Sequence, residues 1–210
     1  TPESQAALLG IKNCYVEMNN VDEYFAYANR LGQGSSVTAS EQDALTYQAA
    51  ERMYMAGNAG VTAQLQKYIQ QFPNGNFVLN ARFYLAESLY KEGRYSEANE
   101  HYTYVAMQPS NLFSEQALSR ASELTFNAEK YEQAIELFNR LETIADSKWN
   151  ILKAYTGQMR CNLKLQRYQN AAAAAEKVKK SDIVNDALVR DANYTIGKSW
   201  FELGNLNMAF

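Results

Sequence analysis

Tyr95-Ser96-Glu97-Ala98 is a four-residue pattern that the chain repeats at nearly constant intervals. The later copies, at steps of 36, 37 and 38 residues, are Tyr131-Glu132-Gln133-Ala134, Tyr168-Gln169-Asn170-Ala171 and Leu206-Asn207-Met208-Ala209. Pro73 and Pro109 are also 36 residues apart. A fixed period of about 20 to 50 residues is the signature of repeat architectures. The chain is therefore expected to be a row of similar structural units.

Each period contains two apolar stripes with helical spacing. The first stripe is Phe83, Ala86, Leu89 and Tyr90, and the second is Ala98, Tyr102 and Val105, which Ala134, Phe138 and Leu141 match in the next unit. Gly93 lies between the stripes, where a glycine can take the left-handed conformation that ends a helix. Proline disfavours continuing a helix, so Pro73 and Pro109 mark unit boundaries. Each unit is expected to be a helical hairpin.

The pattern predicts helices along the whole chain. Their ranges are 3–18, 21–31, 40–56, 60–72, 77–92, 95–107, 112–128, 131–145, 148–165, 168–180 and 183–203, with a further helix starting at 206. Residues 32–40 read as a flexible connection between repeats, and Ser40 as the N-cap of the next helix. We expect one solenoid over 1–210, a piece of a longer protein. Its parts are a degenerate first unit at 1–31, repeats at 41–76, 77–111, 112–147 and 148–182, and an incomplete unit at 183–210.

The composition excludes several classes of function. The 210 residues carry 20 Lys and Arg against 23 Asp and Glu, a net charge of −3, which gives no field for sequence-independent nucleic-acid binding. One histidine and two cysteines leave little for metal sites or catalytic triads, so we expect neither enzyme activity nor a cofactor or metal. Cys14 and Cys161 are expected to be small buried hydrophobic residues, and His101 a surface or packing residue. No stretch is long and apolar enough for a membrane span.

The apolar positions of these units resemble the tetratricopeptide repeat (TPR) family over about residues 40–210. Counted from Leu79, the family's helix-packing positions hold Leu85, Ala86, Ala98, Tyr102 and Val105. The resemblance implies an all-α, right-handed superhelix of about five to six helical hairpins that binds other proteins. The stretches 68–75 and 80–90 are similar to bacterial cell-envelope TPR proteins of the TolA-binding periplasmic and outer-membrane assembly lipoprotein types. This second resemblance implies a periplasmic or outer-membrane-associated protein, with a cytoplasmic location still open.

The family's groove positions hold aromatic and charged residues in this chain. They are Tyr47, Phe83 and Tyr194 at position 5, Glu51, Glu87, Glu123, Arg160 and Lys198 at position 9, and Tyr54, Tyr90, Phe126 and Phe201 at position 12. This set is typical of a peptide groove, since tyrosine supplies contact area at low entropic cost. A structural role is also an open interpretation, with the position-12 aromatics in the core between repeats. The family's carboxylate clamp is not expected, because Phe83 and Glu87 stand where it needs Lys and Asn.

Two hypotheses on function follow. In the first, the protein is a non-enzymatic scaffold whose concave groove binds a peptide or extended protein segment, basic where it meets the glutamates. In the second, the chain is a structural repeat segment of a larger cell-envelope assembly protein with no ligand of its own. An incomplete last unit would leave an apolar face open, so 183–210 is a candidate for self-association.

Overall fold

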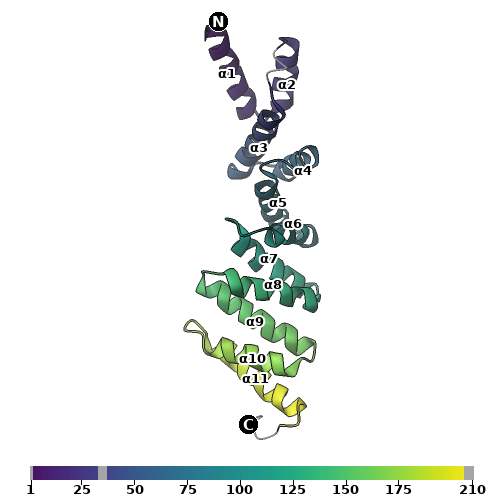
Figure 1. The fold of residues 1–210 in the computed structure, drawn as a ribbon, viewed down its shortest axis with the longest axis vertical. Coiled ribbons are helices and arrows are strands. Elements are labelled where there is room, and N and C mark those ends of the chain that lie inside the picture. Colours follow the sequence, from purple (N-terminus) through teal and green to yellow (C-terminus); the bar gives the residue numbers. More distant parts are fainter. Residues whose placement is uncertain (1, 33–36, 206–210) are drawn as a thin grey trace. The chain divides into compact units, whose positions relative to one another are not determined.

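The computed structural model describes residues 2–32 and 37–205, and over these residues it contains helices and no strands. In chain order they are α1 (Pro2–Glu17), α2 (Val21–Arg30), α3 (Ala39–Met55), α4 (Val61–Gln71), α5 (Val78–Lys91), α6 (Tyr95–Met107), α7 (Ser114–Asn127), α8 (Tyr131–Ile144), α9 (Lys148–Lys164), α10 (Tyr168–Lys179) and α11 (Asp186–Glu202) (Figure 1). The predicted all-α fold is confirmed, and each helix expected within the described residues is present.

Six helix starts lie one to three residues from the predicted ones, and in two of these a capping side chain gives the reason. The helix after the 32–40 connection is capped by Thr38 rather than Ser40, because the Thr38 hydroxyl accepts a hydrogen bond from the Glu41 backbone N–H at 3.1 Å. The last helix begins at Asp186 rather than at 183, since the Asn185 side chain accepts from the Leu188 N–H at 2.9 Å. Residues 33–36 of the predicted connection and the helix expected from 206 lie outside the described residues.

The chain forms two compact units, which we call unit 1 (residues up to His101) and unit 2 (residues from Tyr102). The division falls inside α6, so the predicted repeat 77–111 contributes to both units. In unit 1 the first hairpin packs on α3 through a cluster of Val16, Val21, Tyr24, Leu45 and Ala49. The degenerate first unit at 1–31 is therefore a helical hairpin like the others.

In unit 2 the helices from α7 to α11 lie in chain order, as the green to yellow ribbon in Figure 1 shows. Each packs against the next one in sequence, and α9 also contacts α7 and α11. The run 171–175 is the closest-packed part of α10: Ala171, Ala172, Ala174 and Ala175 are buried, and Ala174 and Ala175 join Leu152 and Met159 in one apolar cluster. Small side chains allow close packing between helices, so this run of alanines serves packing.

The turn after α3 contains two left-handed residues, Gly57 and Gly60, and in each hairpin turn one left-handed residue stands at the same position of the repeat. The residues at that position are Asn19, Gly57, Gly93, Glu129, Gln166 and Gly204, with φ between 55° and 77°. Their spacing is 38, 36, 36, 37 and 38 residues, so they follow the period of the repeat itself. Three of the six are not glycine, and left-handed backbone strains a residue that has a Cβ.

Glycine at one of these turns is expected to stabilise the protein. Gln166 has φ 58° and an exposed side chain, so Gln166→Gly relieves strain and removes no packing. We expect the free energy of unfolding to rise by about 0.5–1 kcal/mol, measured by chemical denaturation. The matched control is Gln169→Gly on the exposed face of α10, which should lower the free energy of unfolding by a similar amount. A loss of stability in Gln166→Gly would contradict this account of the turn.

The two cysteines differ in environment. Cys161 is fully buried as predicted, and burial raises the pKa of its thiol to about 12. The prediction for Cys14 was wrong: this side chain is exposed on α1. The reason is that α1 buries only Val16 among its residues, so most of its apolar positions remain at the surface.

His101 makes unit 1 sensitive to mild acid. Burial lowers the pKa of His101, and the Arg82 guanidinium lowers it further. Arg82 Nη1 lies 3.3 Å from Nδ1, which must accept the hydrogen bond, so a second proton would remove the acceptor. The unfolded chain protonates His101 near pH 6.5, and the folded chain only at lower pH. The free energy of unfolding should therefore fall as the pH drops below about 6.5.

His101→Gln tests this expectation, because the amide carbonyl keeps an acceptor and does not titrate. Denaturation at pH 7.5, 6.5 and 5.5 should show a smaller loss of stability in the variant than in the wild type. Equal losses in both proteins would mean that other groups carry the acid sensitivity.

Candidate functional site

Two of the predicted groove residues belong to the core of unit 1. Tyr47 on α3 and Phe83 on α5 are 3% and 5% exposed, so they offer almost no surface to a ligand. The Tyr47 ring is stacked on Phe77, with centroids 4.5 Å apart and planes at 4°. Their placement on a groove surface is thus corrected. At these two residues, position 5 points into the helix packing of unit 1, where α3 and α5 contact each other directly.

Glu51, Tyr54 and Glu87 are partly exposed on the same two helices. Glu51 Oε1 accepts a hydrogen bond from the Tyr47 hydroxyl at 2.6 Å, and Tyr54 stacks on Tyr84 at 4.4 Å. Burial and then the charge of Glu87 raise the pKa of Tyr54. Unit 1 therefore brings two of the predicted glutamates and one of the predicted tyrosines onto the faces of α3 and α5.

Tyr90 and Phe126 pack inside their own hairpins. The Tyr90 ring meets Tyr95 edge-on at 5.1 Å, and Phe126 meets Tyr131 at 5.5 Å. The partner stands five residues further on in both hairpins. These two aromatics therefore brace the turn between the helices of one hairpin.

The charged groove positions of unit 2 form ion pairs between corresponding helices of successive hairpins. Glu123 on α7 pairs with Lys153 on α9 at 3.2 Å, and Arg160 on α9 pairs with Asp191 on α11 at 2.7 Å. Exposed pairs of this kind contribute about 0–1 kcal/mol each. Tyr194, 62% exposed, and Lys198 extend from α11 toward solvent. The structure thus gives two of these residues partners within the protein.

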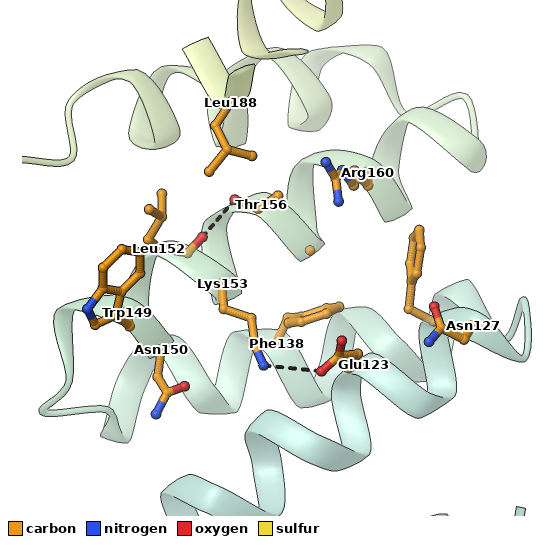
Figure 2. A pocket seen from close by; sticks show the side chains of 12 residues that line it. Glu123, Asn127, Phe138, Trp149, Asn150, Leu152, Lys153, Thr156, Arg160 and Leu188 are labelled. Atoms are coloured by element: carbon orange, nitrogen blue, oxygen red, sulfur yellow. Dashed lines mark hydrogen bonds and ion pairs between the residues drawn. The ribbon is translucent and has the colours of Figure 1, made fainter. Parts of the chain in front are cut away.

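A hollow of about 470 Å³ opens on this part of unit 2 (Figure 2). Side chains from α7, α8, α9 and α11 line it, with Phe138, Leu152 and Leu188 among its apolar walls and Lys153 and Arg160 among its polar ones. Figure 2 shows the Lys153–Glu123 pair beside the Phe138 ring and Leu188 on the opposite wall. Apolar walls with a few placed polar groups are what ligand sites commonly present.

The mouth of the hollow carries an exposed tryptophan. Trp149 is 68% exposed in the first turn of α9. The start of this helix is held by Glu115, whose Oε1 accepts from the Ser147 N–H at 3.1 Å and from the Asn150 amide at 2.8 Å. The Asn150 amide and then the Ser147 N–H lower the pKa of Glu115, against the effect of burial. An ionised carboxylate at neutral pH thus fixes the segment that presents Trp149.

The hollow contains residues that the repeat pattern did not identify. Glu123, Phe126 and Arg160 were predicted and do line it, but Trp149, Phe138, Lys153 and Leu188 were not. One sequence signal could have been used: Gly157 is a glycine inside a helix, which often marks a close approach. A Cβ at Gly157 would lie 2.3 Å from the Phe138 ring, so the ring rests directly on the α9 backbone.

Within residues 2–32 and 37–205, no group of three or more His, Cys, Asp or Glu side chains is arranged to hold a metal ion. None of the helices in that part of the chain has the length and apolar character needed to cross a membrane. Glu51 and Glu87 belong to unit 1, and Glu123 belongs to unit 2.

Comparison with known proteins defines the fold. No family model and no curated protein matches the sequence. Two crystal structures of MamA, a TPR-type helical protein, are similar in structure, both with a TM-score of 0.54 and 17% sequence identity. The first match covers 76% of this chain and 87% of MamA, and the second covers 80% and 86%. The chain therefore has a TPR-like helical-repeat fold.

Proposed function

We propose that the protein is a non-enzymatic interaction scaffold that binds a peptide or an extended protein segment. The observation that carries this proposal is the hollow on α7, α9 and α11, with exposed Trp149 at its mouth. An aromatic side chain left exposed beside an apolar recess is the kind of group that anchors protein interfaces. The TPR-like fold supports the same conclusion, since rows of hairpins present long side-chain surfaces to a partner.

Selection of displayed random peptides on the purified protein tests this function. Enriched peptides are then titrated against Trp200→Phe, in which Trp149 is the remaining tryptophan and reports on the hollow by fluorescence. We expect saturable changes in Trp149 emission. Trp149→Ala, followed by calorimetry, should weaken binding at least about tenfold, as for an anchor residue worth more than about 1.4 kcal/mol.

The matched control is Leu112→Ala, which removes an apolar side chain that is 91% exposed elsewhere in unit 2. It should leave the affinity unchanged. If peptides are enriched but Trp149→Ala binds them as the wild type does, the hollow is not their site. If repeated selections enrich no peptide, the scaffold function is contradicted.

A structural role without a ligand is the second candidate, and the ion pairs of Glu123 and Arg160 favour it. In this hypothesis the chain is a repeat segment of a larger cell-envelope assembly protein, and both side chains hold neighbouring hairpins together. Glu123→Gln and Arg160→Gln would then lower stability and change no binding. The periplasmic or outer-membrane location remains a prediction from the sequence resemblance. Self-association through 183–210 remains a prediction from the incomplete last unit, and sedimentation at several protein concentrations would measure it.

A further inference from the structure

One tyrosine of unit 1, Tyr54, packs differently from the aromatic residues at the same repeat position in the next two hairpins. The Tyr90 and Phe126 rings each pack against a tyrosine five residues further on, whereas the residue five positions after Tyr54 is Ala59. Alanine offers no ring, so Tyr54 stacks instead on Tyr84 of α5, with centroids 4.4 Å apart and planes at 18°. Tyr84 thereby covers one face of the Tyr54 ring, and the opposite face of the ring points away from Tyr84.

A cation of the protein itself occupies that second face. The Lys91 ammonium lies over the Tyr54 ring, 5.3 Å from its centroid. An ammonium group does not fit between rings that are 4.4 Å apart, so it must lie on the side away from Tyr84. Lys91 is exposed at the end of α5. Cation–π contacts at exposed sites are weak, so a competing cation can displace this ammonium.

Two carboxylates are close enough to act on the stacked pair. The Glu87 charge acts on Tyr54 and the Glu51 charge on Tyr84, in both cases after the effect of burial. Glu51 is itself oriented by the Tyr47 hydroxyl, 2.6 Å from its Oε1. Both glutamates are partly exposed. A ring face with a carboxylate beside it complements a guanidinium, which stacks on aromatic faces and donates hydrogen bonds to a carboxylate at the same time.

We propose that the outer face of Tyr54, with Glu87 beside it, is a binding site for an arginine side chain of a partner segment, and that Lys91 is an internal occupant which the arginine displaces. Arginine is favoured over lysine because its planar group is less strongly hydrated and can engage ring and carboxylate together. This site rests on the proposed scaffold function only in that its ligand is a protein segment. It lies in unit 1 and does not involve Trp149.

The test uses the full chain with ¹³C-labelled tyrosine and short Gly/Ser peptides that carry two arginines, two lysines or two citrullines. Citrulline keeps the shape of arginine without its charge. We expect the arginine peptide to shift the Tyr54 and Tyr84 ring signals in a saturable way, the lysine peptide to bind more weakly, and the citrulline peptide to leave them in place. Equal shifts from the citrulline peptide would overturn the proposal.

Lys91 variants separate displacement from general charge effects. Lys91→Ala should tighten binding of the arginine peptide by about two- to fivefold, since no internal cation has to leave. Lys91→Arg keeps the charge and supplies a stronger occupant, so it should weaken binding. If only net charge mattered, Lys91→Arg would bind as the wild type does, and that result would refute the displacement.

Glu87→Gln should weaken binding of the arginine peptide several-fold more than Glu100→Gln does. The second substitution makes the same charge change at an exposed position of α6 that also belongs to unit 1. Equal effects of the two substitutions would exclude a specific role for Glu87. Trp149→Ala should leave the affinity for the arginine peptide unchanged. The experiments on the hollow and on the Tyr54 site can therefore fail independently of each other.

Discussion

Gly157→Ala is expected to destabilise unit 2 by about 3 kcal/mol, at the upper end of the cost of overpacking a core. The new Cβ would stand 2.3 Å from two carbons of the Phe138 ring, and Phe138 is 3% exposed. The ring has little room to retreat, so α8 and α9 must separate or Phe138 must leave its rotamer. The free energy of unfolding from chemical denaturation measures the loss.

The control for Gly157→Ala is the same substitution at Gly10. Gly10 also lies inside a helix, but a Cβ added there would meet no other part of the described chain within 4 Å. Gly10→Ala should therefore stabilise the protein by up to about 1 kcal/mol, following helix propensity. Adding Phe138→Leu to Gly157→Ala should recover part of the stability, because the smaller side chain makes room. No recovery in the double variant would show that the clash with Phe138 is not the cause.

Gly157→Ala should also abolish peptide binding in the hollow, if the proposed function is right. Phe138 forms part of the wall, and its displacement would fill or reshape the space beside Leu188. The Tyr54 site should keep its affinity for the arginine peptide under conditions where the variant is folded, because unit 1 contains neither Gly157 nor Phe138.

Asp43→Ala is expected to destabilise unit 1 by about 3 kcal/mol, since it leaves buried hydrogen-bond donors without an acceptor. The Asp43 carboxylate is 4% exposed and accepts from the Tyr68 hydroxyl at 2.5 Å and from the Asn76 backbone N–H at 2.7 Å. The Tyr68 oxygen in turn accepts from the Phe77 N–H at 3.2 Å. This network ties the segment between α4 and α5 to α3.

The control for Asp43→Ala is Asp22→Ala, which removes a carboxylate from the exposed pair with Lys67. Its cost should stay below about 1 kcal/mol. Hydrogen exchange localises the effect: Asp43→Ala should speed exchange of the Asn76 and Phe77 amides first. Exchange that rises evenly along the chain, or a loss no larger than that of Asp22→Ala, would contradict the role given to the buried carboxylate.

The repeat period made most of the local structure predictable. Hairpins form because each apolar stripe lies on one helical face, and Ala98, Tyr102, Ala134 and Leu141 are all buried as that pattern requires. The turns obey the same period. Gly93 was predicted to be left-handed, and Glu129 takes the same conformation without being glycine. The position in the repeat therefore sets the backbone, and the residue type only changes its strain.

The candidate site was less predictable, because one position of a repeat can have different partners in successive units. Position 9 holds Glu51 beside a tyrosine hydroxyl in unit 1 and Glu123 in an ion pair in unit 2. At position 12, Tyr90 packs against Tyr95, five residues further on. Tyr54 has Ala59 at the corresponding place and stacks on Tyr84 of another helix. The role of each side chain depended on a residue in a neighbouring helix.

Helices and turns depend on residues a few positions apart. The spacing of these residues alone gives each helix an apolar face and sets where a left-handed residue ends it. The burial of Tyr47 and Phe83, the hollow beside Trp149 and the buried carboxylate of Asp43 depend instead on how closely two helices approach and how each is rotated. That approach is set by single contacts such as Phe138 on Gly157, between residues 19 positions apart, which no periodic pattern encodes.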